Sequence, residues 1–106
     1  MRPHPNVVQI LGLSTDGPFP ALILEYCSGG SLDKLLKDKS KDITDAYRLR
    51  IISGISKGMY HLHKANIVHR DLAARNILLS GDGEPKVSVR IFIHRWNFTL
   101  VCSLFN

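Results

Sequence analysis

The chain of 106 residues is 44% hydrophobic and 22% charged, a balance typical of a single globular domain. Its net charge of +5 is too small for a nucleic-acid-binding surface, and no apolar run approaches the ~20 residues that cross a membrane. Two cysteines, Cys27 and Cys102, form no disulfide framework, and residues 1–5 lack the apolar core of a signal peptide. We therefore expect a cytoplasmic protein with reduced cysteines that binds no nucleic acid and spans no membrane.

Two short strands are predicted in the first quarter of the chain. A turn at residues 5–6 is followed by the β-forming residues 7–11. Residues 14–20 are rich in Gly and Pro and indicate a loop. The apolar residues 21–24 predict a second strand. It leads to the glycine pair at 29–30, where the backbone can approach a neighbour closely.

A short amphipathic helix is predicted next. Ser31 is a suitable N-cap, and Leu32, Leu35 and Leu36 then share one face at spacings of i, i+3 and i+4. The outward face carries two basic residues, Lys34 and Lys37.

A longer helix is predicted after a charged linker at residues 37–42. Asp42 or Thr44 can act as its N-cap. Its apolar stripe, spaced by three or four residues, consists of Tyr47, Ile51, Ile55, Met59 and Leu62. Gly54 and Gly58 each weaken an isolated helix by roughly 1 kcal/mol relative to Ala, so they favour close packing of another element against this helix.

A polar loop at residues 69–76 separates two apolar runs, at 67–68 and 77–79, which we predict as buried strands. A hairpin turn at 80–84 and a further strand at 85–88 follow. Since buried charges are costly unless they are paired, a rigid scaffold that presents such a loop is typical of a functional site.

Three side chains of this loop indicate phosphoryl transfer. Asp71 can accept a proton from an attacking hydroxyl group, Asn76 can bind a metal ion through its carbonyl oxygen, and Arg75 can lie near a transferred phosphate. The sequence therefore predicts a site at which charge on a phosphoryl group is held and a hydroxyl is oriented.

Residues 69–76 form the pattern H-R-D-L-x-x-x-N, which resembles the catalytic loop of protein kinases. Ala73 and Arg75 make the loop similar to those of tyrosine kinases and tyrosine-kinase-like enzymes, because serine/threonine kinases usually carry Lys two residues after the aspartate. Residues 4–12 resemble the turn and fourth strand of the kinase small lobe, and residues 21–32 resemble the fifth strand and the hinge.

The resemblance covers residues 1–88 and implies an α+β fold: the end of the small lobe, the hinge and the start of the large lobe of a protein kinase. It implies transfer of the ATP γ-phosphoryl group to a protein substrate, with ATP and Mg²⁺ as cofactors. Asp71 would be the base or hydroxyl-orienting residue, Arg75 would aid phosphate placement, and Asn76 would be a magnesium ligand.

The resemblance also implies an adenine-binding hinge. The Glu25 carbonyl and the Cys27 amide would face adenine through backbone groups. Leu24 would guard the pocket behind the base, Leu78 would form its floor, and Gly30 would permit close backbone approach.

The likeness ends at Ser88. Kinases continue with Asp-Phe-Gly, whose Asp binds magnesium, but residues 89–91 are Val, Arg and Ile, and neither Val nor Ile can ligate a hard cation. The chain contains no G-x-G-x-x-G motif, and we find no counterpart of the ATP-binding Lys and its Glu partner. Residues 89–106 hold four of the eight aromatic residues and no acid. We predict a divergent tail, with a strand at 90–93 and an apolar run at 98–105 that has no evident partner.

Three hypotheses remain open from the sequence. The chain is part of a tyrosine-type protein kinase, or a non-catalytic kinase-like fragment that binds a partner, or a gene-model product without stable function. The absent phosphate loop, lysine and metal-binding aspartate favour the second and third for the isolated chain. We also expect that further large-lobe helices are needed to cover Tyr47, Ile51 and Ile55.

Overall fold

The computed structural model describes residues 2–18, 21–67, 69, 71–88 and 99–100. The described residues contain both helices and strands, which confirms the predicted α+β class. In chain order the elements are β1 (Ile10–Ser14), β2 (Ala21–Leu24), β3 (Gly30–Ser31), α1 (Leu32–Lys37), α2 (Asp45–Lys64), the 3-10 helix η1 (Ala74–Asn76), β4 (Ile77–Leu79), β5 (Pro85–Val87) and β6 (Thr99–Leu100).

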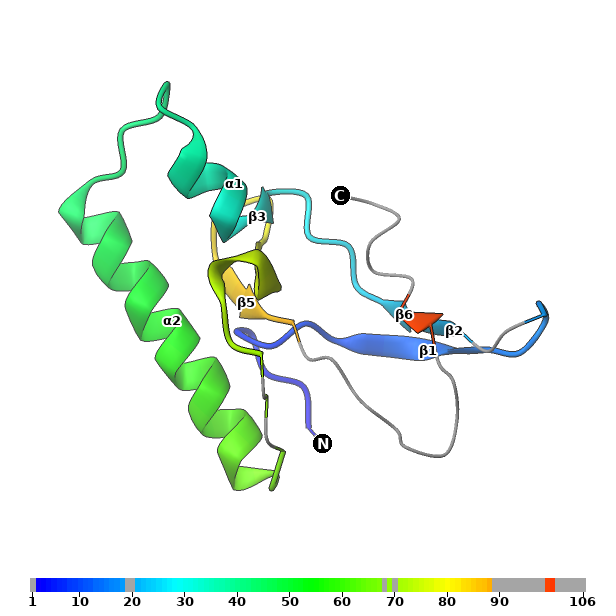
Figure 1. The fold of residues 1–106 in the computed structure, drawn as a ribbon. Coiled ribbons are helices and arrows are strands. Elements are labelled where there is room, and N and C mark those ends of the chain that lie inside the picture. The colour runs from blue at the N-terminus through cyan, green and yellow to red at the C-terminus, as the bar shows by residue number, and fades with distance from the viewer. Residues whose placement is uncertain (1, 19–20, 68, 70, 89–98, 101–106) are drawn as a thin grey trace.

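The strands form two small sheets. Antiparallel β1 and β2 make a ribbon that extends away from α2 (Figure 1), and β6 pairs with β2 in parallel. The second sheet has the antiparallel order β3-β4-β5, and α2 packs beside it. The connection from β2 to β3 joins the two sheets, and it is the segment that we predicted as the hinge.

The N-terminal turn belongs to the second sheet, so our prediction of a strand at residues 7–11 is wrong in its position. The N–H of Val8 donates to the Val87 carbonyl (2.9 Å), and the N–H of Val87 donates to the Asn6 carbonyl (2.8 Å). Val7 and Val8 are 3% and 4% exposed, because they pack into the core beside β5. The regular strand therefore starts only at Ile10, where the chain leaves this core.

Helix α1 begins as predicted, with the Ser31 hydroxyl accepting a hydrogen bond from the Lys34 N–H (3.3 Å). Leu32 is buried and Leu35 packs against the core. Leu36 is 57% exposed, so its predicted place on the apolar face is wrong. Leu36 is rotated by about 100° from Leu35 around the helix axis, so it lies to one side of the covered face. Helix α1 has only six residues and buries a narrow apolar stripe.

Helix α2 carries the predicted apolar stripe, and its N-cap is Thr44, whose hydroxyl accepts from the Tyr47 N–H (3.1 Å). Ile51 is 5% exposed, and Tyr47 and Ile55 pack against the same core, so the expectation that these residues need further helices as cover is wrong. The exposed apolar residues of α2 lie elsewhere on its surface: Leu49, Ile52 and Tyr60.

The two helix glycines mark close contacts, as predicted. A Cβ atom on Gly54 would lie 2.4 Å from Cγ of Pro85, and one on Gly58 would lie 2.4 Å from the Asn6 carbonyl oxygen. Real Cβ atoms do not approach other atoms this closely, so glycine is needed where α2 meets the N-terminal turn and β5.

The hairpin turn at residues 80–84 and the strand after it are also confirmed. The Gly83 N–H donates to the Ser80 carbonyl (2.9 Å), and Gly83 has a φ of 83°, a conformation that glycine adopts without strain. Before the polar loop, Ile67 lies outside any strand, so that predicted strand is not found at the residue that the structure describes.

The tail is described only at Thr99 and Leu100. These residues pair with Ala21 and Leu22, so the predicted apolar run does have a partner at this point, along the edge of β2. The strand predicted at residues 90–93 lies outside the described residues.

Candidate functional site

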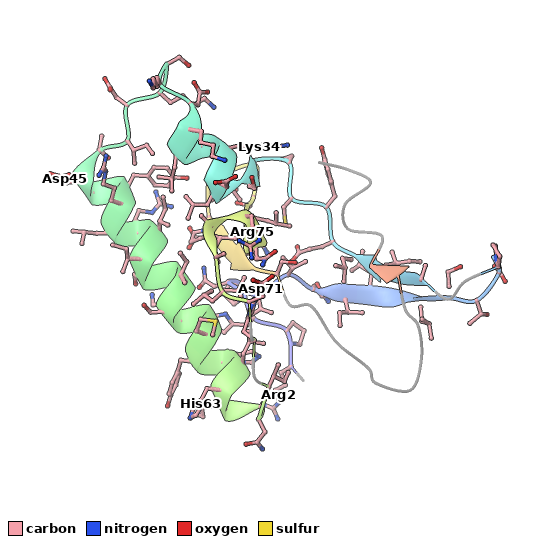
Figure 2. All side chains as sticks on the ribbon, in the orientation of Figure 1. Arg2, Lys34, Asp45, His63, Asp71 and Arg75 are labelled. Atoms are coloured by element: carbon pink, nitrogen blue, oxygen red, sulfur yellow. The ribbon has the colours of Figure 1, made fainter. Side chains whose placement is uncertain are left out.

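The loop predicted to carry the chemistry brings Asp71, Arg75 and Asn76 together. Arg75 Nη2 lies 2.5 Å from Asp71 Oδ1, and Asn76 Nδ2 lies 3.1 Å from Asp71 Oδ2. Asn76 Nδ2 also donates to the Asp71 carbonyl oxygen (2.7 Å). Figure 2 shows the Asp71 and Arg75 side chains side by side in front of β5. Both carboxylate oxygens of Asp71 therefore have a donor, which fixes the orientation of this side chain.

His69 fixes the backbone of the loop through two hydrogen bonds. Its side chain is buried, Nδ1 accepts a hydrogen bond from the Asp71 N–H (3.1 Å), and Nε2 lies 2.7 Å from the Ser88 carbonyl oxygen. A carbonyl oxygen only accepts, so Nε2 must carry the proton, and the ring is the neutral tautomer. His69 thus ties the backbone at Asp71 to the end of β5.

Asn76 is held on two sides by the backbone. The 3-10 helix η1 ends at this residue, where its N–H donates to the Ala73 carbonyl (2.9 Å) and its carbonyl accepts from the Ser88 N–H (2.8 Å). Since Nδ2 faces Asp71, the side-chain oxygen is the atom that remains to bind a cation. A neutral oxygen of this kind suits Mg²⁺, but the three residues after Ser88 include no acid that would supply a second, charged ligand. Among the described residues, Asn76 can therefore supply one neutral ligand to a magnesium ion.

The residues of the predicted adenine site form a second, apolar group. Cys27 and Leu78 are each 4% exposed and pack together with Val8, and Leu24 packs against them. Leu78 belongs to β4, which directly follows η1, so this group and the polar loop share one rigid connection. Gly30 pairs with Leu79 at the edge of the same sheet and has a φ of 75°.

The hinge backbone is partly engaged. The Glu25 N–H donates to the Gln9 carbonyl (2.9 Å), and the Cys27 carbonyl accepts from the Gly30 N–H (3.3 Å). These bonds use the opposite group of each residue from the one that the resemblance assigns to adenine. The use of the Glu25 carbonyl and the Cys27 amide for adenine stays a prediction.

Sequence reasoning missed the role of the Glu25 side chain. Its carboxylate accepts from the Gln9 N–H (2.8 Å) and lies 3.2 and 3.3 Å from Lys86 Nζ. Both charged side chains are mostly buried, at 24% and 17% exposed. The pair joins the hinge to β5. A charged residue between two apolar ones in a short strand was the available signal, since a buried Lys requires a partner.

Asn6 is a second residue whose role the sequence did not reveal. Its side chain is 4% exposed, and Nδ2 donates to the Pro85 carbonyl (2.9 Å) and to Glu84 Oε1 (3.3 Å). Its own N–H donates to His4 Nδ1 (3.0 Å). Asn6 therefore links the N-terminal turn to β5.

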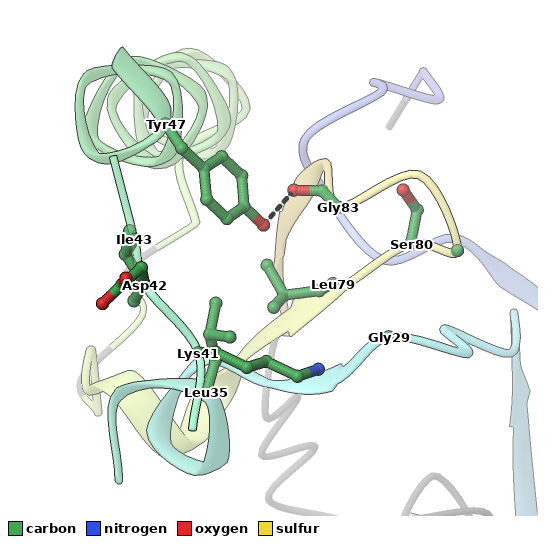
Figure 3. Close-up of a pocket in the computed structure, with 10 residues that line it drawn as sticks. Gly29, Leu35, Lys41, Asp42, Ile43, Tyr47, Leu79, Ser80 and Gly83 are labelled. Atoms are coloured by element: carbon green, nitrogen blue, oxygen red, sulfur yellow. Dashed lines mark hydrogen bonds between the residues drawn. The ribbon is translucent and has the colours of Figure 1, made fainter. Parts of the chain in front are cut away.

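A cavity of about 290 Å³ lies away from Asp71, between the start of α2 and the β4–β5 turn (Figure 3). The Tyr47 hydroxyl donates to the Gly83 carbonyl (2.8 Å) at its back, and Leu35 and Leu79 line it. Only Gly29 of its lining belongs to the hinge, so this cavity is distinct from the predicted adenine site. None of the described helices is long and apolar enough to span a lipid bilayer.

Comparison with known proteins identifies the family of the chain. The family profile described as "Protein tyrosine and serine/threonine kinase" matches residues 1–91. The chain is 42% identical over 90 residues to a G-type lectin S-receptor-like serine/threonine-protein kinase of Arabidopsis thaliana, over 80% of this chain and 11% of the relative. It is 38% identical over 85 residues to ephrin type-A receptor 8 of Rattus norvegicus, over 80% of this chain and 23% of that protein.

The chain belongs to the protein kinase family. It is also 46% identical over 92 residues to cyclic GMP-binding protein C of Dictyostelium discoideum, over 85% of this chain and 3% of that protein. The chain thus spans less than a quarter of each of these three relatives. Their names include a serine/threonine-protein kinase and an ephrin receptor, so they do not settle which hydroxyl amino acid this chain would serve.

Proposed function

We propose that residues 1–88 are the hinge and catalytic-loop part of a tyrosine-type protein kinase domain, which transfers the ATP γ-phosphoryl group to a protein hydroxyl. Residues 89–106 form a divergent tail in this proposal. The observation that supports it most directly is the arrangement of Asp71, with Arg75 on one carboxylate oxygen and Asn76 on the other. Catalysis of phosphoryl transfer depends mainly on positioning and electrostatic stabilisation, so a carboxylate held in one orientation suits this reaction.

Each loop residue has one role in this proposal. Asp71 orients the substrate hydroxyl and accepts its proton, while Arg75 holds Asp71 and approaches the transferred phosphate. Asn76 supplies a magnesium ligand, and the ion neutralises charge on the ATP phosphates. His69 positions the Asp71 backbone through its buried hydrogen bond. The Glu25 carbonyl and the Cys27 amide face adenine, and Leu78 forms the floor of its pocket. Leu24 guards the pocket behind the base, and Gly30 permits close backbone approach.

The tyrosine-type assignment rests on Ala73 and Arg75. Arg75 follows Asp71 by four residues and reaches its carboxylate within one turn of chain, so the loop needs no Lys at position 73 to supply a positive charge there. The Arg75 side chain is 60% exposed, which leaves it accessible to a substrate.

The 106-residue polypeptide by itself is inactive in this proposal and binds Mg-ATP weakly. It contains no G-x-G-x-x-G loop, and Val89 and Ile91 follow Ser88 where kinases have a metal-binding acid. The same observation supports the second candidate, a non-catalytic kinase-like chain that acts by binding a partner.

A chimera tests the proposed function. Residues 1–88 replace the matching segment of a complete tyrosine kinase that supplies the phosphate loop, the lysine and Asp-Phe-Gly. We expect the chimera to phosphorylate a tyrosine peptide, and Asp71→Asn to lower its turnover by ~10²–10⁴-fold, the usual contribution of such a base. ATP affinity should change little, because Asp71 lies outside the predicted adenine site.

Asp82→Asn is the matched control, since Asp82 is an exposed acid in the β4–β5 turn. It should leave turnover unchanged. A folded chimera without activity, or with equal activity in the Asp71 and Asp82 variants, contradicts the assignment. Phosphorylation of a serine peptide in preference to a tyrosine peptide overturns the tyrosine-type part alone.

A further inference from the structure

A group of basic side chains lies where the N-terminal segment meets the last turns of α2. We name this group the basic patch, and it consists of Arg2, His4, Lys57, His61 and Lys64. The rings of His4 and His61 have centroids 4.8 Å apart, and His61 Nε2 donates to the Arg2 carbonyl oxygen (2.7 Å). Figure 2 places Arg2 at the C-terminal end of α2. The patch is therefore one surface built from two segments.

No acidic residue balances this surface from either segment. Residues 1–15 and 46–70 contain no Asp or Glu. The ion pairs of the described residues involve Lys37, Arg50, Arg75 and Lys86, all outside the patch. Arg2, Lys57 and Lys64 are exposed, and Lys64 Nζ lies 5.4 Å from the ring centre of the exposed Tyr60. Glu84 lines a pocket together with Lys57, but its ion pair is with Arg50, so none of the ion pairs of the described residues neutralises the patch.

The arrangement of the patch favours an extended acidic peptide. Lys57, His61 and Lys64 follow one another at i, i+4 and i+7, so they lie in a row along about 10 Å of helix. Alternate residues of an extended chain project to one side about 7 Å apart, and the long, flexible side chains of Lys57 and Lys64 can span the difference in spacing. A site for a single phosphate instead has donors that converge on one point.

We propose that the basic patch is a docking surface for an extended acidic segment of a partner protein, with Asp or Glu at alternate positions. This surface lies apart from Asp71, so the proposal stands independently of the proposed function. The free energy of docking comes from charge complementarity at an exposed surface, and salt should weaken it strongly.

His4 gives docking a pH dependence. Burial lowers the pKa of His4 below its usual 6.5, and the neighbouring His61 and Lys57 lower it further. The Asn6 N–H donates to His4, while the Asn6 side chain donates to Glu84 (3.3 Å), which Arg50 binds (3.1 Å). Carboxylates of a bound peptide offset the repulsion from His61 and Lys57, so docking raises the His4 pKa, takes up protons and tightens as the pH falls.

Fluorescence anisotropy on the full 106-residue chain tests the proposal, with a fluorescein-labelled peptide in which Glu and Ser alternate. We expect Lys57→Glu with Lys64→Glu to weaken binding about tenfold or more at low salt. The matched control is Lys34→Glu with Lys39→Glu, which makes the same change in net charge at exposed positions outside the patch. It should change the affinity less than about twofold.

Binding of the original chain should tighten about threefold or more between about pH 8 and about pH 6, and His4→Gln should reduce this gain. Equal losses in the two double variants overturn the proposal, because an unspecific or unfolded basic chain responds only to net charge. Vesicles containing phosphatidylserine, or a uridine homopolymer, serve as competing probes. Tighter patch-dependent binding of either one than of the peptide also overturns it, since the partner is then a membrane or a nucleic acid.

Discussion

The packed unit around α2 and the ribbon of β1 and β2 differ in how their apolar residues are covered. In the packed unit Leu62 and Val87 are fully buried, and Ile77 is 2% exposed. In the ribbon, Leu11 and Leu13 are 60% and 52% exposed. Apolar residues on the ribbon therefore lack cover within the described residues, while the unit that carries the catalytic loop buries its own core.

The difference follows from where the contacts come from. The packed unit joins segments that are far apart in the chain. Asn6 and Val8 hydrogen-bond to Val87, and α2 packs closely against the N-terminal turn and β5. The ribbon is made by two strands that follow one another in the chain, and β6 adds only a two-residue pairing to β2. A hairpin with so little added pairing is marginally stable at best. The catalytic loop belongs to the packed unit, and the hinge connects this unit to the ribbon.

Substitution of Gly58 by alanine should have the largest effect on the packed unit. In Gly58→Ala the new Cβ meets the Asn6 carbonyl oxygen at 2.4 Å, and this oxygen also accepts from the Val87 N–H. We expect a loss of about 2–3 kcal/mol in the free energy of unfolding, since overpacking against backbone exceeds the ~1 kcal/mol gain in helix propensity. Urea unfolding followed by far-UV circular dichroism measures it.

Gly12→Ala in the ribbon is the control, because a Cβ at Gly12 has no atom within 4 Å. It should change the free energy of unfolding by no more than about 0.5 kcal/mol. An equal loss in the free energy of unfolding in both variants would contradict the claim that the packed unit is more closely packed than the ribbon.

Removing the buried amide of Asn6 tests the link between the N-terminal turn and β5. Asn6→Ala leaves the buried Pro85 carbonyl without its donor, and we expect a loss of about 1–3 kcal/mol. Hydrogen exchange at the amides of Val8 and Val87 should rise in parallel. Gln9→Ala, at an exposed position just before β1, serves as the comparison, and an equal effect there would argue against the link.

Much of the fold was predictable where local signals and packing agree. The caps at Ser31 and Thr44, the stripe on α2, the strand of residues 21–24 and the turn at 80–84 all follow from periodicity and turn chemistry. The two glycines of α2 predicted a close contact, although the sequence could not name the partner, because the partners Asn6 and Pro85 lie far away in the chain.

The errors arose where non-local contacts decide the structure. Val7 and Val8 have strand propensity and were assigned to the ribbon, but Val87 draws them into the other sheet. For the candidate site, the sequence predicted that Asp71, Arg75 and Asn76 act together, and the structure brings them together. It did not predict the Glu25–Lys86 pair, since no local pattern joins residues sixty-one positions apart.

A mostly buried ion pair and an exposed one should differ in their contributions to stability, and both effects should be smaller than those above. Glu25→Gln removes the charge from a pair that is 24% and 17% exposed and leaves Lys86 mostly buried beside a neutral amide. We expect a loss of about 1 kcal/mol, more than an exposed pair contributes. Thermal unfolding should show it as a lower midpoint.

Lys37→Met breaks the exposed Asp33–Lys37 pair of α1, whose side chains are 38% and 76% exposed, and it should cost less than about 0.5 kcal/mol. A loss in Lys37→Met as large as that in Glu25→Gln would show that burial of the hinge pair adds nothing to its contribution.

The smallest expected effect is the pH dependence that His4 adds to the packed unit. The His4 pKa in the folded chain lies below 6.5, because burial and the charges of His61 and Lys57 disfavour its cation, and Nδ1 accepts from the Asn6 N–H. Above the unfolded pKa both states are neutral, and the contribution to stability is fully present. As the pH falls below about 6.5, the unfolded chain binds the proton first, so the free energy of unfolding decreases until the folded pKa is passed. Urea unfolding across this range should show the decrease, and His4→Gln should flatten it, whereas Asp38→Asn in the exposed α1–α2 linker should not. A His4→Gln variant with the same slope between neutral and acidic pH would place the titrating group elsewhere and remove His4 from the energetics of the N-terminal turn.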